Sequence, residues 1–424
     1  MRASRPLRTL LYCHDTYGLG HLRRTLSVAT MLSASPLDGA RLVVSGSPLG
    51  QRFPFPPGTD LVSLPAVVKV GAGRYEPRAL PIGYPAIRAI RRELILAVAR
   101  TFRPDLVLVD HAPGGLDGEI LPALHDLRRE APGTRLVLGL RDVLDESSCV
   151  KAAWQRDGSH ALLDELYDRV VVYGERDIYD VTKEYGFSNR AADKTRFVGY
   201  LGRSVSRLDR EAVLARHGLD AQRLALVTMG GGGDGARLAQ AVIGAIRTGR
   251  APSDLAWLMV GGPLMPTGAW EGLVSAAAAL PGVRLVRFLD DLPSHVRAAD
   301  LVVSMGGYNT VCEILASGRP ALIVPRTEPR QEQWIRAGLL EQRGLVRVLH
   351  PEGIGPQALL REIRALAETD PRPLPDRMLD GLPRLEAELV QLMGTGPTEV
   401  AAVAGRTAAG VVPLPVDAGS MVAA

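Results

Sequence analysis

One histidine stands where a base would be needed in a ligand cleft. His21 ends the stretch Asp15-Thr-Tyr-Gly-Leu-Gly-His, so that Gly18 and Gly20 come just before it. The stretch joins an apolar run (9–14) that predicts a buried strand to a segment (21–33) with helical spacing. Glycines at such a junction let backbone approach a ligand, and the helix N-terminus favours negative charge. The imidazole could take a proton from an attacking hydroxyl. A histidine that merely caps or packs the helix remains the alternative.

A second glycine stretch, residues 230–233, lies between a predicted strand (224–229) and a predicted helix (236–247). Each glycine costs about 0.5–1 kcal/mol of stability relative to alanine. Packing does not explain successive glycines at this cost, whereas a backbone nest that binds a phosphate does. The Gly-Lys-Ser/Thr ending of a P-loop is missing. A carboxylate would repel phosphate, so we expect Asp234 to cap the helix.

The densest pattern runs from 288 to 313, where a glycine pair leaves a predicted strand (301–304) and opens a helix. Asn309 and Thr310 are capping types that can also bind an anion or a sugar. Glu313 falls about one turn further on, facing the loop, where a carboxylate suits two ribose hydroxyls. A capping box that uses Glu313 is the alternative, and it leaves the glycine pair unexplained. The pattern comprises Phe288, Leu289, Leu292, Gly306, Gly307, Asn309, Thr310 and Glu313.

Gln331 lies in a polar loop (325–334) that follows the predicted strand 321–324. Open α/β sheets bind ligands at this end of their strands. A solvated helix start is the alternative.

Strands alternate with helices through most of the chain, which predicts an α/β fold with parallel sheets. Residues 46–84 are rich in proline and glycine with weak periodicity, so we expect an irregular stretch there, either an acceptor-side loop or a surface excursion. The length of 424 residues favours two domains. We divide the chain into an N-terminal domain (1–198), a C-terminal domain (199–370), a helical region (371–393) and a disordered tail (394–424).

The net charge of +4 suits an anionic ligand or an acidic membrane surface. The arginines are scattered along the sequence rather than clustered on one face, which argues against a nucleic-acid-binding protein. Three distant cysteines predict neither a disulfide framework nor structural zinc. We find no signal peptide and no membrane span, so we expect a cytoplasmic protein. Peripheral membrane contact rests on helix 87–102, where Arg88, Arg91, Arg92 and Arg100 share a segment with apolar residues. A helix packed on the sheet is the alternative that we favour.

Together these stretches resemble the GT-B glycosyltransferases of family 28, specifically over about 198–350 and more loosely over 9–35. The resemblance implies two Rossmann-like domains whose parallel sheets face across a cleft, with the nucleotide-sugar donor bound mainly by the C-terminal domain. It also implies transfer of a hexose or N-acetylhexosamine from a UDP-sugar to an acceptor hydroxyl, with inversion.

The resemblance assigns roles to individual positions. It implies that Gly231, Gly232 and Gly233 form the diphosphate loop, and that Arg203 approaches the donor phosphates. Uracil would lie against Phe288, Leu289 and Leu292, with Gly306, Gly307, Asn309 and Thr310 turning over the phosphates. Ribose would be held by Glu313 and the donor sugar by Gln331, while His21, after Gly18 and Gly20, matches the base.

Two departures from the family pattern concern the substrates. His14, Asp15 and Thr16 replace a run of small residues, which leaves the acceptor open: a lipid-linked sugar, a polysaccharide or a natural product. Glu332 replaces a glutamine, which weakens any assignment of N-acetylglucosamine.

The chain has no D-x-D triplet, so we expect no metal and no cofactor, with helix N-termini acting on the departing diphosphate. A UDP-sugar 2-epimerase is one rival reading, which would need more acid–base groups than His21 and Glu332. A non-catalytic nucleotide-sugar binding protein is the other, and it would not need His21.

Overall fold

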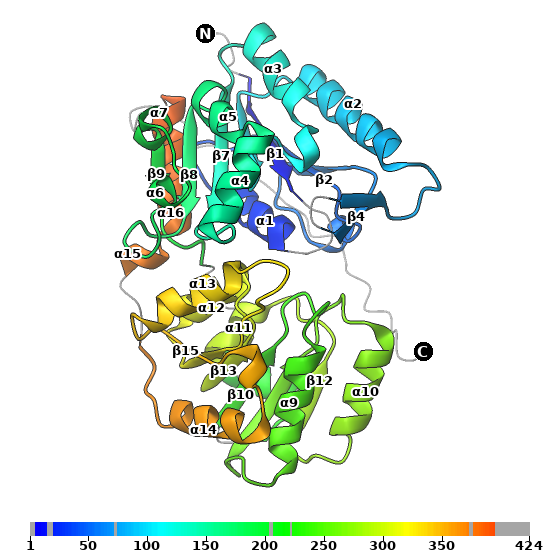
Figure 1. Cartoon of the computed structure of the whole chain (residues 1–424), viewed down its shortest axis with the longest axis vertical. Helices are drawn as coiled ribbons and strands as arrows, with labels where there is room; N and C mark the ends of the chain where they lie inside the picture. The colour runs from blue at the N-terminus through cyan, green and yellow to red at the C-terminus, as the bar shows by residue number, and fades with distance from the viewer. Residues whose placement is uncertain are drawn as a thin grey trace, which may run out of the picture.

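The computed structural model describes residues 5–14, 20–71, 74–202, 207–220, 223–372 and 376–394. Two α/β domains lie one above the other (Figure 1), each built on a parallel sheet with helices on both faces. This arrangement confirms the predicted fold class. Alternating apolar strands and amphipathic helices form such layers because both faces of a parallel sheet need cover.

The first sheet has seven strands in the order β3-β2-β1-β6-β7-β8-β9, with all neighbours parallel. Its strands are β1 (Leu7–Cys13), β2 (Gly39–Ser45), β3 (Thr59–Ser63), β6 (Leu106–Asp110), β7 (Arg135–Arg141), β8 (Arg169–Tyr173) and β9 (Thr195–Phe197). The helices of this domain are α1 (Gly20–Ser33), α2 (Tyr84–Phe102), α3 (Leu121–Glu130), α4 (Ser147–Asp157), α5 (Ser159–Glu165), α6 (Val181–Glu184) and α7 (Asn189–Asp193), with 3-10 turns η1 (Gly50–Arg52) and η2 (Leu116–Gly118).

The second sheet has six strands in the order β12-β11-β10-β13-β14-β15, also parallel. Its strands are β10 (Arg223–Thr228), β11 (Leu255–Val260), β12 (Val283–Val286), β13 (Leu301–Ser304), β14 (Ala321–Ile323) and β15 (Arg347–Val348). The helices are α8 (Arg210–Arg216), α9 (Ala236–Arg247), α10 (Thr267–Ala277), α11 (Leu292–Ala298), α12 (Tyr308–Ser317), α13 (Glu332–Glu341), α14 (Pro356–Ala367) and α15 (Asp376–Leu379), with the turn η3 (Pro351–Gly353).

The expectation of an irregular stretch over 46–84 is wrong. This region contributes β3 to the main sheet and forms an antiparallel hairpin of β4 (Val67–Gly71) and β5 (Arg74–Pro77). Short, half-exposed strands leave little periodicity to read, and their pairing partners decide their conformation.

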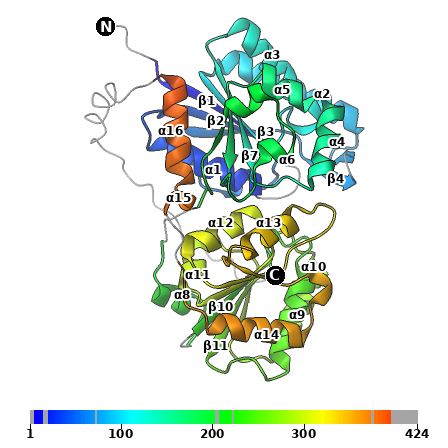
Figure 2. The ribbon, with the colours of Figure 1, turned by 60° about the vertical axis from the view of Figure 1, so that its left-hand side comes forward.

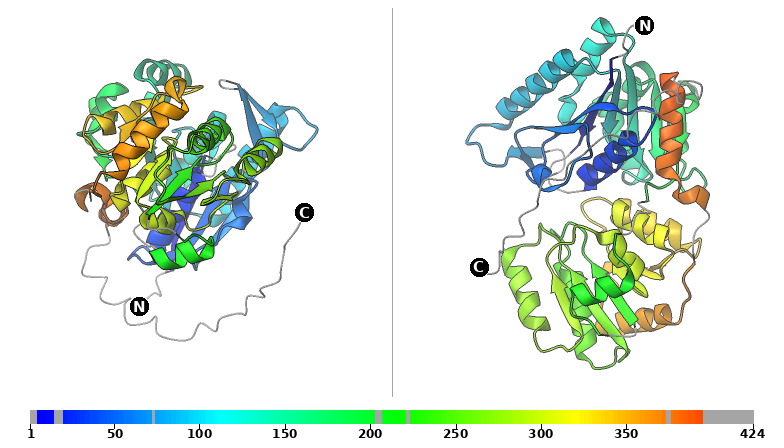
Figure 3. Two further views of the ribbon diagram at one scale, coloured as in Figure 1. Left: turned by 90° about the horizontal axis from the view of Figure 1, so that it is seen from below. Right: turned by 180° about the vertical axis from the view of Figure 1, so that it is seen from behind.

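The last described helix, α16 (Gly381–Met393), returns to the first domain, where it packs beside α1 and β8 (Figures 2 and 3). Leu385 and Leu389 enter the core there, and Arg384 pairs with Glu175 at 2.7 Å. The chain therefore crosses between the domains twice, and the crossings touch where the amide of Tyr200 donates to the carbonyl of Met378 (2.9 Å). The predicted tail beyond 394 lies outside the described residues.

Helix α2 packs on the first domain through a buried arginine. Arg91 pairs with Glu119 at 2.6 Å, and both side chains are almost fully buried. The favoured alternative, a helix packed on the sheet, is confirmed, and Arg91 does not belong to the basic set suggested for membrane contact, whereas Arg88 and Arg92 lie nearer the surface. Among the described residues, no helix is long and apolar enough to cross a membrane.

Candidate functional site

His21 lies against a buried carboxylate at the carboxyl end of the first sheet. Its Nδ1 is 2.5 Å from Oδ2 of Asp110, the last residue of β6. Arg24, one helical turn beyond His21 on α1, binds the same carboxylate through Nε and Nη2 at 2.7–2.9 Å. Burial alone would raise the pKa of Asp110, but Arg24 and His21 outweigh it and hold that pKa well below its usual value. The carboxylate is therefore ionised and fixes the orientation of the imidazole, which leaves Nε2 on its far side.

Two further imidazoles surround His21. The ring centroids of His14, His21 and His111 lie 5.0–5.7 Å apart. Burial lowers the pKa of His14 to about 3 and that of His111 well below its ordinary value. Both rings are therefore neutral at physiological pH, and they extend the polar surface beside His21.

Glycines of the second domain form a tight loop after β10. Gly232 has φ 91°, and a Cβ there would collide with the carbonyl of Gly261, so only glycine fits. Gly231 accepts a hydrogen bond from the amide of Leu264 (2.9 Å), while Gly233 is exposed. The expectation that Asp234 caps α9 is wrong: the N-cap is Gly235, and Asp234 pairs with Arg326 at 3.2 Å.

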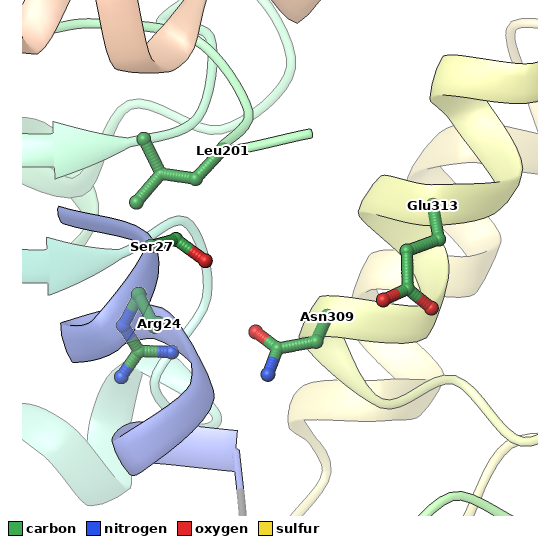
Figure 4. Close-up of a pocket in the computed structure, with 5 residues that line it drawn as sticks. All are labelled: Arg24, Ser27, Leu201, Asn309 and Glu313. Carbon is green, nitrogen blue, oxygen red and sulfur yellow. The ribbon is translucent and has the colours of Figure 1, made fainter. Parts of the chain in front are cut away.

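Glu313 lies buried within α12, facing the first domain. The N-cap of α12 is Gly307, and no side chain caps it; Asn309 and Thr310 are already helical, so the alternative of a capping box around them does not hold. Glu313 is 4% exposed. It lines a cavity of about 10 Å³ together with Arg24, Ser27, Leu201 and Asn309, and Figure 4 shows residues of the two domains on its opposite sides. That volume holds roughly one water molecule.

Several predicted donor residues touch the first domain. Asn309 donates through Nδ2 to the carbonyl of Gly20 at 2.9 Å. Arg23 on α1 lies 5.4 Å from the ring of Phe288, which is 38% exposed, and donates to the carbonyl of Leu289 at 3.3 Å. The backbone N–H of Gln331 donates to Oδ1 of Asp145 at 2.8 Å.

Other predicted positions are buried within the second domain. Leu289, Leu292 and Thr310 are buried, and Gly306 accepts a hydrogen bond from Arg336 at 3.0 Å. Gly18 and Arg203 lie outside the described residues.

Sequence reasoning missed Asp110, Arg141, Asp142 and Arg336. Asp110 and Arg141 are the last residues of β6 and β7, and a charged residue that ends an apolar run is a usable signal for a ligand-side group. Nothing local in the sequence indicates that Asp142 meets Arg336 on α13.

Part of the chain matches a known protein family, and several described proteins are similar to it in sequence. Residues 269–379 match the glycosyltransferase family 28 C-terminal domain. The chain is 26% identical over 384 residues to the UDP-N-acetylglucosamine–N-acetylmuramyl-(pentapeptide) pyrophosphoryl-undecaprenol N-acetylglucosamine transferase of Paenarthrobacter aurescens (strain TC1), covering 85% of this chain and 88% of that protein. Matches of higher identity are shorter: 35% with the transferase of the same description from Glaesserella parasuis serovar 5 (strain SH0165), spanning 22% of that relative.

Solved structures share the two-domain fold. MurG of Acinetobacter baumannii superposes with a TM-score of 0.54 at 15% identity, covering 92% of this chain and all of that one. A putative UDP-N-acetylglucosamine 2-epimerase from Listeria monocytogenes gives 0.61 at 13% identity, covering 92% and 97%. Residues 269–379 therefore match the glycosyltransferase family 28 C-terminal domain, and the chain as a whole is similar to glycosyltransferases of that family and shares the two-domain GT-B fold.

Proposed function

We propose that this protein transfers a hexose or N-acetylhexosamine from a UDP-sugar to an acceptor hydroxyl, with inversion at the anomeric carbon. The observation that carries the proposal is the pair His21–Asp110, with its 2.5 Å contact at the carboxyl end of the first sheet, across the cleft from Glu313. One side of the cleft offers a base and the other a buried acid suited to ribose. The relatives named above support UDP-N-acetylglucosamine as the first donor to try.

In the proposed reaction, Nδ1–H of His21 donates to Asp110, and Nε2 takes the proton of the acceptor hydroxyl. The acceptor oxygen forms its bond to the anomeric carbon from the face opposite the diphosphate. The bond from that carbon to the β-phosphate oxygen breaks, and UDP leaves with the electron pair. Backbone amides of the glycine loop (230–233) and of the start of α12 stabilise the charge that develops on the diphosphate. No metal ion enters this scheme.

The two domains must separate for the donor to enter, because the cavity beside Glu313 holds roughly one water molecule. The paired chain crossings at Tyr200 and Met378 are the natural hinge. Closure then brings the acceptor-side base and the donor together and excludes water.

Calorimetric titration with UDP, UDP-N-acetylglucosamine, UDP-glucose and NAD, in EDTA, tests the donor site. We expect UDP to bind and NAD not to bind. Glu313→Ala should abolish UDP binding, and Glu352→Ala, an exposed acid of the same domain, should leave it unchanged. Equal UDP affinity in the wild-type protein and Glu313→Ala would refute the proposed donor site.

A UDP-sugar 2-epimerase is the second candidate, favoured by the extra imidazoles of His14 and His111 beside His21. Incubation with UDP-N-acetylglucosamine without any acceptor separates the two functions. An epimerase converts the donor to its C2 epimer, which NMR resolves, whereas a transferase leaves its stereochemistry unchanged.

We further propose that the protein works at the inner face of the membrane. Leu80, Ile82, Ile90 and Leu94 are exposed apolar side chains at and before α2, and Arg88 and Arg92 belong to the same helix. Apolar and cationic side chains together favour an anionic bilayer. Co-sedimentation with phosphatidylglycerol vesicles should exceed that with phosphatidylcholine vesicles, and Leu94→Ser should reduce it. Equal sedimentation with both lipids would exclude this contact.

A further inference from the structure

Arg141, the last residue of β7, carries a charge that no described residue pairs. Its Nε is buried without a hydrogen-bond partner, and none of the ion pairs among the described residues includes it. The next residue, Asp142, is by contrast fully engaged with Arg336. A buried cation without a counter-charge destabilises a fold by several kcal/mol, so such a group calls for a function.

Three arginines and one acid lie close enough to Arg141 to shift its pKa. Burial lowers its pKa to about 10, and Arg24, Arg336 and Arg330 add to the lowering while Glu332 opposes it. The acids near these arginines are already engaged, Asp110 with Arg24 and Asp142 with Arg336. Glu332 pairs with Arg326 at 3.0 Å. The other oxygen of Glu332, Oε2, is buried without a hydrogen-bond partner among the described residues, and Arg141 is the first of the charges that lower the pKa of Glu332. An anion entering here would meet a guanidinium that forms no ion pair among the described residues and whose charge Glu332 offsets only in part.

Two neighbouring strands present unpartnered donors at the same edge of the sheet. His111 follows β6, the neighbour of β7, and so lies beside Arg141, while His14 follows β1 on the other side of β6, with its ring centroid 5.2 Å from that of His111. Nδ1 of each ring is buried without a partner among the described residues, and His111 is 8% exposed. His111 also has φ 73°, a strained backbone for a residue with a Cβ, which is typical of functional sites.

We propose that Arg141, His111 and His14 form a subsite for an anionic group of the acceptor, a carboxylate or a phosphate ester, next to the hydroxyl that receives the sugar. The planar guanidinium donates two parallel hydrogen bonds to either anion. A neutral imidazole donates one more. The ring of His111 lies 5.0 Å from that of His21, so the bound anion stands within a few bonds of the oxygen that His21 deprotonates.

The subsite is separate from the proposed donor site. The glycine loop (230–233) and Glu313 belong to the second domain, whereas these three residues all come from the first. No group of three or more histidine, cysteine or acidic side chains among the described residues is arranged to hold a metal ion, so the imidazoles are assigned here as hydrogen-bond donors. The inference rests on the proposed function, because it names the class of acceptor that the same cleft takes.

The test is calorimetric titration of the full chain at constant ionic strength, with and without saturating UDP. Inorganic phosphate and pyrophosphate are the probes for a phosphate ester of the acceptor, and glucuronate is the probe for a carboxylate. We expect one class of probe to bind the wild-type protein, and Arg141→Gln to weaken it at least about tenfold. Arg141→Lys should weaken it less, and Arg250→Gln, an exposed arginine of the second domain, should have no effect.

The thermal midpoint of Arg141→Gln is the control for folding. We expect it to equal or exceed that of the wild-type protein, because the substitution removes an unpaired buried charge. If the thermal midpoint falls, Arg141→Met, with a side chain of similar length, replaces Arg141→Gln in the titration. Unchanged anion affinity in the variant overturns the proposal. If UDP binds and no probe binds, the subsite is overturned and the donor site stands. If a probe binds and UDP does not, the donor site is overturned and the subsite stands.

Discussion

The carboxylate of Asp142 at the end of β7 and the guanidinium of Arg336 on α13 form an ion pair that joins the two domains, with Nη2 2.7 Å from Oδ1. Both side chains are almost fully buried. Arg336 also donates to the carbonyl of Gly306 at 3.0 Å and lies 5.6 Å from the ring of Tyr308. One residue thus links the first sheet to the glycine turn that begins α12.

Removing one partner of this pair should destabilise the closed protein strongly. Arg336→Met leaves Asp142 as an unpaired buried charge, which costs about 3–5 kcal/mol. Urea unfolding measures the free energy of unfolding directly. Arg347→Met, which breaks an exposed pair with Glu362, should cost less than about 1 kcal/mol. Equal losses in the two variants would show that the interdomain pair is no stronger than a surface pair.

Asp110→Asn should impair the proposed transfer more than donor binding. An asparagine no longer stabilises the Nδ1–H form of His21 and removes the counter-charge of Arg24. We expect kcat to fall about 10²–10⁴-fold, with the donor KM little changed. The measurement is a steady-state assay of UDP release, with Asp157→Asn, an exposed acid of the same domain, as control. A kcat equal to that of the wild-type protein would remove Asp110 from the mechanism.

Gly232→Ala should distort the loop proposed to bind the diphosphate. The residue has φ 91°, and the added Cβ collides with the Gly261 carbonyl. We expect a strain of about 1–3 kcal/mol, a lower urea midpoint and weaker UDP binding. Gly244→Ala on α9, where the nearest atom to a Cβ is 3.8 Å away, is the matched control and should not destabilise. Unaltered UDP affinity in Gly232→Ala would separate this loop from the donor site.

A buried histidine pair should make stability fall in mild acid. Nε2 of His217 lies 2.9 Å from Nε2 of His295, and burial lowers the pKa of His217 to about 4 and that of His295 in the same direction. Because the unfolded chain binds protons near pH 6.5 and the folded pair does not, stability is complete above pH 6.5 and is lost as the pH falls toward 4.

The check is the free energy of unfolding between pH 7.5 and 4. His217→Asn should flatten that dependence, while His350→Asn, an exposed histidine, should leave it as it is. The groups that face the pair are Arg216, Asp290 and Asp291. If the pH dependence of the free energy of unfolding is the same in His217→Asn as in the wild-type protein, the acid sensitivity comes from other groups.

Much of the fold was predictable because its signals are local. Apolar runs such as 104–110 and 224–229 form the buried strands β6 and β10, since a parallel strand covered on both faces must be apolar along its length. The comparisons confirm the resemblance to family 28. The two domains with parallel sheets confirm the GT-B architecture. The roles assigned to individual site residues stay predictions, to be decided by the experiments above.

The sequence by itself determined the two sheets, the glycine turns at their carboxyl ends and the place of His21 at the start of a helix. Only the tertiary structure decided what those groups meet. Asn309 and Gly20 are 289 positions apart and Asp142 and Arg336 are 194 apart, and Arg91 reaches Glu119 inside the first domain rather than a membrane. Local periodicity specifies which face of an element is apolar, whereas the partner of a buried charge depends on how distant elements pack.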